Sequence, residues 1–122
     1  DLDAQIHREV MGLHCEYGFS RAYEESEQDG KDWWNTFDGD PSSVQNRWSR
    51  VPNYTADIAE AWGIIESLCG SDFMVARIDH GGGLSRCGFY TVHAGSLIAI
   101  ASREAAPLAI CLAALAAVRT KQ

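Results

Sequence analysis

Apolar residues recur at the spacing of an α-helix in three parts of the chain. In the N-terminal segment the apolar residues are separated by four, four and three positions and share one helix face: Leu2, Ile6, Val10 and Leu13. Gly12 suits the end of this helix, because glycine readily adopts the left-handed conformation with which helices often end. The chain is therefore predicted to begin with a short amphipathic helix.

The strongest helical pattern covers residues 55–69. Its apolar positions form a single stripe, made of Ile58, Ala61, Trp62, Ile65, Leu68 and Cys69. Thr55 or Asn53 can cap the N-terminus, and Asp57 suits the positive end of the helix dipole. Because Trp62 lies in the middle of the stripe, we expect its ring to lie in the core.

A third helix is predicted over residues 105–118. Its apolar stripe consists of Leu108, Cys111, Leu112, Leu115 and Val118. Pro107 falls in the first turn, where no backbone amide donor is needed, so it is compatible with a helix that begins near Glu104.

Three short apolar segments lie between the second and third predicted helices. They are residues 73–78, 87–92 and 97–101, and they are separated by turns at Gly81–Gly83 and Ala94–Ser96. Short connections without helices make neighbouring strands antiparallel. The pattern predicts an α+β fold, with one antiparallel sheet of three to four strands packed with helices.

The remaining part of the chain is less regular. Cys15–Phe19 alternates like a short strand, whereas residues 21–50 have no sustained period. We interpret residues 21–50 as an irregular acidic insertion, with one short strand around Trp33, in a single domain that spans residues 1–122.

Two segments resemble the phage αβα-sandwich family, small proteins of tailed phages and prophages. Pro52–Trp62 matches the DIAxAW part of the family's helix pattern TDIAxAW, Glu104–Val118 contains the closing pattern APxAICxAAL, and Val10–Gly12 fits the end of the first helix. The resemblance covers mainly residues 1–13 and 52–118. It implies that helices cover both faces of the sheet. The family has no assigned biochemical activity that could be carried over.

Charge is distributed unevenly along the chain. The net charge is −7, and residues 1–62 contribute −8 (13 acids, 5 bases) while residues 63–122 contribute +1 (4 acids, 5 bases). Nucleic-acid affinity comes mainly from Lys and Arg that displace counterions, so direct nucleic-acid binding is disfavoured. A partner with a basic surface fits this charge better, although acids also serve simply to keep a protein soluble.

The acidic insertion is the first candidate for a partner-binding surface. From Glu24 to Asp40 it has a net charge of −6 and contains adjacent tryptophans. Tryptophan is enriched at interaction hot spots, and carboxylates can receive Arg or Lys from a partner. The predicted partner-binding residues are Glu24, Glu25, Glu27, Asp29, Asp32, Trp33 and Trp34. In an extended segment the two tryptophans point to opposite faces, so one can pin the loop while the other is exposed.

The glycine-flanked strands offer an alternative ligand site, for example for a nucleotide signal that the protein sequesters. Its candidate residues are Arg77, His80, Arg86 and Tyr90, which supply cations and an aromatic ring. Gly81–Gly83 itself is predicted to be a hairpin turn, because a strand and not a helix follows it and no Lys is near.

The sequence contains no motif that indicates catalysis, a metal or a cofactor. The four cysteines are widely separated and form no Cys-x-x-Cys pair, so they are expected to be thiols in a reducing cytosol. The longest apolar run, Ala105–Val118, is shorter than the ~20 residues that a membrane-spanning helix needs. We therefore expect a non-enzymatic phage protein of the host cytoplasm that binds and modulates a host defence or regulatory protein. Small-ligand sequestration and a structural role in the virion remain alternatives.

Overall fold

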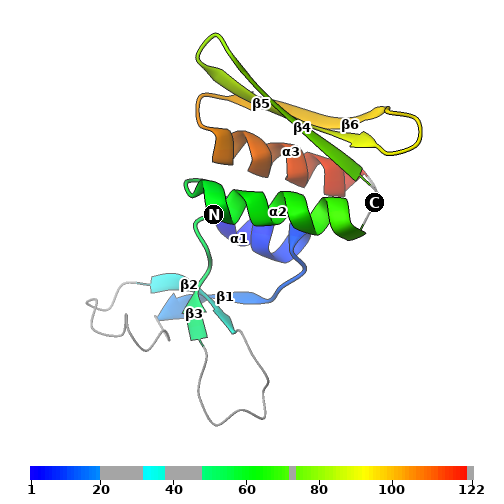
Figure 1. The fold of residues 1–122 in the computed structure, drawn as a ribbon. Helices are drawn as coiled ribbons and strands as arrows, with labels where there is room; N and C mark the ends of the chain where they lie inside the picture. The colour runs from blue at the N-terminus through cyan, green and yellow to red at the C-terminus, as the bar shows by residue number, and fades with distance from the viewer. Residues whose placement is uncertain (20–31, 38–47, 72–73, 121–122) are drawn as a thin grey trace.

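The computed structural model describes residues 1–19, 32–37, 48–71 and 74–120 (Figure 1). Its helices are α1 (Leu2–Gln5), the π-helical turn η1 (Ile6–Val10), α2 (Ile58–Ser71) and α3 (Ala106–Thr120). Its strands are β1 (Cys15–Phe19), β2 (Asp32–Phe37), β3 (Trp48–Arg50), β4 (Met74–Gly81), β5 (Leu84–Thr91) and β6 (Leu97–Arg103). The predicted α+β class is confirmed.

Strands β4, β5 and β6 form an antiparallel sheet in that order, as the short connections predicted. Gly82 and Gly83 connect β4 to β5 with φ angles of 60° and 78°. Residues with a side chain rarely adopt such angles, and two of them in succession match the twist of a tight hairpin. A register shift between Phe89 and Tyr90 then displaces the pairing of β5 with β6.

Helix α3 covers one face of this sheet, and α2 packs beside it (Figure 1). The shared core contains Ile6, Tyr54, Ala61, Ile64, Ile65, Leu68, Met74, Cys87, Phe89, Ala99, Ala109, Ile110, Cys111, Ala113, Ala114, Leu115 and Ala117. Alanines dominate the buried positions of α3, so neighbouring elements approach its backbone closely. The larger side chains of the core come mainly from α2 and the sheet.

Helix α2 is rotated relative to the predicted orientation. Its buried stripe is Ala61, Ile64, Ile65 and Leu68, whereas Ile58 and Trp62 are 51% and 50% exposed. The prediction that Trp62 is a core residue is wrong. Apolar residues at positions 58 to 69 fit two overlapping stripes of helical spacing, and the stripe with Ile64 in place of bulky Trp62 allows the closer contact with alanine-rich α3.

The N-cap of α2 also differs from the prediction. The Oδ1 atom of Asp57 accepts hydrogen bonds from the backbone N–H groups of Ala59 (2.8 Å) and Glu60 (3.4 Å). Asp57 is therefore the capping residue, and neither Thr55 nor Asn53 has that role. The backbone N–H of Thr55 instead donates to Asp3 Oδ1 at 2.9 Å, which ties this turn to α1.

A second, smaller sheet contains β1, β2 and β3 in antiparallel order. The predicted strands at Cys15–Phe19 and around Trp33 are confirmed, whereas β3 was not predicted. The strands therefore form two separate sheets. The N-terminal helix ends just before Gly12, whose φ of 69° agrees with its predicted role at the helix end. Leu13, which was assigned to the apolar face of this helix, lies beyond that end and is exposed at 49%.

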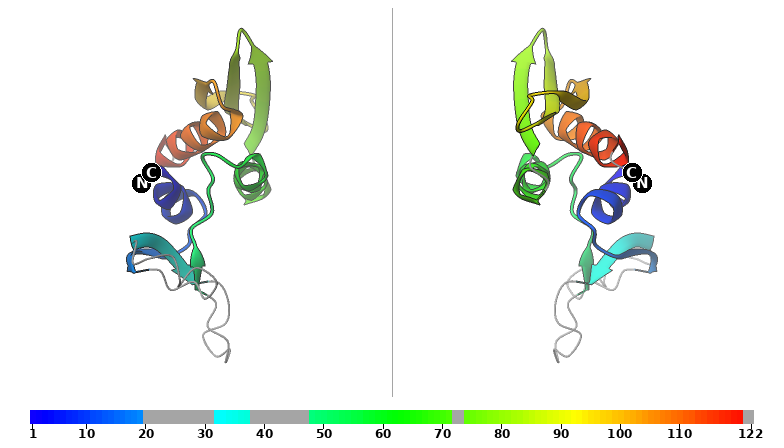
Figure 2. Two further views of the ribbon diagram at one scale, coloured as in Figure 1. Left: turned by 90° about the vertical axis from the view of Figure 1, so that its left-hand side faces the viewer. Right: turned by 90° about the vertical axis from the view of Figure 1, so that its right-hand side faces the viewer.

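The helices lie between the two sheets (Figures 1 and 2). As a result, they cover only the inner face of the β4–β6 sheet. Val75 and Ile100, on its outer face, are exposed. The resemblance implied helices on both faces, but in the described part of the chain the outer face is open.

Candidate functional site

The predicted partner-binding segment is only partly visible in the structure. Glu24, Glu25, Glu27 and Asp29 lie outside the described residues, whereas Asp32, Trp33 and Trp34 belong to β2. Because β2 is extended, side chains two positions apart lie on the same face of the strand. Thr36 and Trp34 share the face that lies toward η1.

Trp34 is half-buried and packs between two described side chains. Its ring lies 5.3 Å from the ring of Tyr17, its cross-strand partner, and the Arg8 guanidinium lies 5.1 Å from its centroid. Such a cation–π contact is attractive and holds the indole against the helix. Of the predicted residues, Trp34 thus has a packing role that explains its presence.

The alternative ligand residues are divided between the two faces of the β4–β6 sheet. Arg77, Arg86 and Tyr90 lie on the outer face, whereas His80 shares the inner face with Ser85. His80 Nδ1 and Ser85 Oγ are hydrogen bonded at 2.9 Å. The four residues therefore do not form one site.

The three residues that do share a face form a flat platform. The Arg77 guanidinium lies 5.4 Å from the centroid of the Tyr90 ring. A side chain at Gly88 would meet this ring at 2.9 Å, so the ring lies directly over the glycine. Arg86 Nε donates to Ser102 Oγ at 3.3 Å. This open arrangement differs from the enclosed pocket that a small ligand usually occupies.

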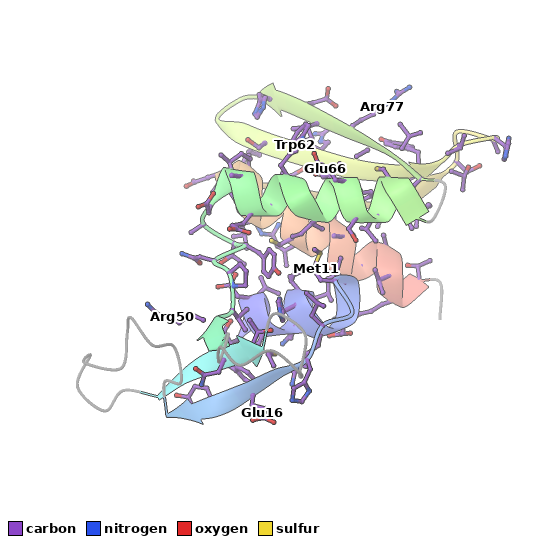
Figure 3. All side chains as sticks on the ribbon, turned by 60° about the horizontal axis from the view of Figure 1, so that its bottom comes forward. Met11, Glu16, Arg50, Trp62, Glu66 and Arg77 are labelled. Carbon is purple, nitrogen blue, oxygen red and sulfur yellow. The ribbon has the colours of Figure 1, made fainter. Side chains whose placement is uncertain are left out.

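The α2 helix carries an exposed surface that sequence reasoning missed. Ile58, Ala59, Trp62, Gly63 and Glu66, together the α2 surface, line a shallow hollow of about 470 Å³. Figure 3 shows Trp62 and Glu66 next to each other on the helix. They are four residues apart, the spacing at which helical side chains become neighbours. The hollow therefore combines an indole ring with a carboxylate.

The charge around the α2 surface is negative. Between Arg50 and Arg77 the sequence has four acids and no Lys, Arg or His. Among the described residues, Glu66 has no ion-pair partner. The absence of cations over so long a stretch was the signal in the sequence that could have indicated the α2 surface. It was not used, because the apolar stripe alone assigned Trp62 to the core.

A buried hydrogen-bonded cluster joins η1 to the small sheet. His7 is buried, with Nδ1 2.7 Å from Tyr54 Oη and Nε2 2.8 Å from Thr36 Oγ1. Thr36 Oγ1 donates to the backbone carbonyl of His14 at 2.9 Å. Thr36 must therefore accept from His7 Nε2–H, while Nδ1 forms the second hydrogen bond of the ring with Tyr54. The cluster gives His7 a structural role.

The cysteines are free thiols within packed surroundings. Burial raises the pKa of Cys87 to about 11 and that of Cys111 to about 12, so neither is activated as a nucleophile. In the ranges that the structure describes, no three His, Cys, Asp or Glu side chains come together as a metal site requires. No helix in these ranges is long and apolar enough to cross a membrane.

Comparison with known proteins gives one family. The family model described as "Phage ABA sandwich domain" matches residues 5–115. This span includes both sequence patterns on which the resemblance rests, as well as the acidic segment between them. No curated protein and no solved structure matches the chain significantly.

Proposed function

The chain belongs to the phage ABA sandwich domain family, and we propose that it is a phage-encoded binding protein that modulates a basic protein of the host cell through the α2 surface. The observation that carries this proposal is the half-exposed Trp62 beside Glu66. A large aromatic side chain that could have entered the core is instead presented to the solvent. Binding of this kind requires no catalytic residue, in agreement with the expectation of a non-enzymatic protein.

The chemistry of the hollow favours an Arg or Lys of the partner. A guanidinium can stack on the face of an indole and, at the same time, donate hydrogen bonds to a neighbouring carboxylate. Trp62 and Glu66 offer these two groups side by side. Ile58, which is exposed on the same surface, adds apolar area around the contact. An exposed Trp in such a setting is typical of an interaction hot spot.

The acidic segment from Glu24 to Asp40 has a supporting role in this proposal. Its charge of −6 attracts a basic partner over several ångströms and thereby raises the association rate. The short-range contact that determines the dissociation rate is assigned to Trp62. The two contributions can therefore be separated by their dependence on salt.

Affinity capture with matched variants tests the proposal. The tagged parent protein is incubated with host-cell lysate beside Trp62→Ala and Glu66→Lys, with Tyr17→Ala and Glu104→Lys as controls at other exposed positions. We expect a basic host protein that the parent and both controls retain, and that Trp62→Ala and Glu66→Lys lose. The affinity loss for Trp62→Ala should be about 30-fold or more, as for a hot-spot residue.

The same experiment identifies a wrong choice of surface. If Trp62→Ala retains the host protein as well as the parent protein does, the α2 surface has no role in binding. In that case, loss of the protein on reversal of Glu24, Glu25, Glu27 and Asp29 to Lys assigns binding to the acidic segment. Sequestration of a nucleotide signal is less well supported, because His80 lies on the other side of the sheet from the platform around Tyr90.

A further inference from the structure

The outer face of the β4–β6 sheet has an apolar end that is exposed. The face consists of Val75, Arg77 and Asp79 from β4, Arg86, Gly88 and Tyr90 from β5, and Leu97, Ile100 and Ser102 from β6. Val75 pairs with Tyr90, and Tyr90 pairs with Leu97, so these residues form one row across the sheet. Val75, Ile100 and Leu97 are 43%, 45% and 55% exposed. A sheet face that contacts only water normally carries polar residues, whereas this end of the face carries aliphatic ones.

The other end of the same face carries both signs of charge. Asp79 pairs with Arg86 in the strand register, and Arg86 pairs with Ser102. Within the described ranges, neither Asp79 nor Arg86 takes part in an ion pair, although they are cross-strand neighbours. The face is therefore polarised along the strands, with aliphatic groups at one end and unpaired opposite charges at the other.

We propose that two copies of the chain associate through this face, with a two-fold axis parallel to the strands. This axis sets the apolar end of one copy on the apolar end of the other. It also brings the charged ends together, where Asp79 of each copy comes within reach of Arg86 of the partner subunit. The contact is isologous and its charges are self-complementary. Two sheets packed in this way keep their strands nearly aligned.

The chemistry of the face favours a second copy over the other occupants. A nucleic acid would meet Val75, Leu97 and Ile100, which offer it nothing, and it would approach a protein with a net charge of −7. An acidic protein would satisfy Arg86 but leave Asp79 against like charge. A second copy satisfies both residues and buries the aliphatic row.

The mass of the protein in solution tests this inference. Light scattering is measured at a protein concentration of about 100 µM. Because this concentration lies above the micromolar upper end of Kd for standard interfaces, the parent should have the mass of a dimer. Ile100→Glu and Leu97→Glu should raise the dissociation constant by about 100-fold, because a buried carboxylate replaces apolar contact. Leu13→Glu is the control, since Leu13 is equally exposed but lies before β1. Circular dichroism melts verify that each variant is folded.

Charge exchange between copies tests the two-fold arrangement itself. Asp79→Arg alone and Arg86→Glu alone should each weaken the dimer, because like charges then meet. A one-to-one mixture of the two variants should restore it as a heterodimer, since each copy supplies what the other lacks. A monomeric parent, equal effects of Ile100→Glu and Leu13→Glu, or a mixture that remains monomeric overturns the proposal. Trp62→Ala should leave the dimer intact, which keeps this result separate from the proposed partner binding.

Discussion

Trp62 shows how the exposure of one side chain changes the interpretation of the molecule. As a core residue it would only stabilise the fold, whereas on the surface it is the large apolar group on which the proposed partner binding rests. Its neighbour Ile64, two positions along α2, is fully buried. One helix therefore carries both a buried side chain that stabilises the fold, Ile64, and an exposed one that is accessible to a partner, Trp62.

Substitution of the two residues should lower stability by very different amounts. Ile64→Ala should lower the free energy of unfolding by about 2–5 kcal/mol, because it leaves a cavity in a packed core. Trp62→Ala should lower it by less than about 1 kcal/mol, since half of the ring is already in water. Urea melts of both variants and the parent provide the comparison. A larger loss for Trp62→Ala than for Ile64→Ala would return Trp62 to the core.

Tyr54 is a second residue whose surroundings can be measured directly. Burial raises its pKa to about 12, and the nearby Glu60 and Asp3 carboxylates add to the effect. The folded state therefore favours the neutral phenol, which is hydrogen bonded to His7. The resulting stabilisation is complete below pH 10 and is lost as the pH rises through about 12.

An ultraviolet absorbance titration should therefore show one tyrosine that ionises near pH 12. Tyr54→Phe should remove this step and leave the earlier part of the curve in place. The variant should also lose less stability than the parent between pH 10 and 12, because it has no phenol to ionise. A titration curve that is unchanged by Tyr54→Phe would show that the phenol is not buried.

At the scale of elements, the contact between α2 and α3 depends on small residues. Ala113 in α3 is fully buried, whereas Ala116, three positions further, is exposed. The backbones of the two helices can approach closely only if no side chain of α3 extends into the contact. This requirement explains why Ala61, and not the bulkier Trp62, lies on the buried side of α2.

Ala113→Leu should thus lower the free energy of unfolding by about 1–3 kcal/mol, the usual cost of overpacking a core. Ala116→Leu is the matched control and should change it by no more than about 0.5 kcal/mol, because both residues favour helix and the site is exposed. Thermal or urea melts of both variants and the parent measure these changes in the free energy of unfolding. If both variants melt alike, α3 does not form a tight contact at Ala113.

The elements that were predicted correctly have strong local signals. The hairpin at Gly82–Gly83 requires two positive φ angles, and two successive glycines predict such angles. The face of α2 was wrong because periodicity defines a stripe only to within one position, and tertiary contact with α3 decides between two overlapping stripes. Strand β3 and the separation of the sheets were missed because pairing partners lie far apart in the sequence. The α2 surface was missed through the same error, since Trp62 had been assigned to the core.

At the scale of the whole molecule, the two sheets are attached to the helices by different forces. The β4–β6 sheet contributes Cys87, Phe89 and other apolar side chains to the main core. Among the described side chains, none from β1–β3 belongs to that core. The small sheet is joined to the helices instead by polar contacts, such as the hydrogen bond of Thr36 with His7. Regions with few buried apolar contacts open more readily than the core.

Cysteine labelling should reveal this difference, because buried thiols report on each part of the molecule. Cys15 lies in β1, whereas Cys87 and Cys111 lie in the main core. In native buffer, Cys15 should react with a disulfide reagent faster than Cys87 and Cys111, which become accessible only on global unfolding. Thr36→Val should accelerate the labelling of Cys15 by about 10-fold, equivalent to the ~1.4 kcal/mol of a lost buried hydrogen bond, and leave the other two rates nearly unchanged. Mass spectrometry of the labelled peptides assigns each rate to its cysteine. Equal rates at all three positions, with and without the Thr36 hydroxyl, would mean that the small sheet and the main core unfold as a single cooperative unit.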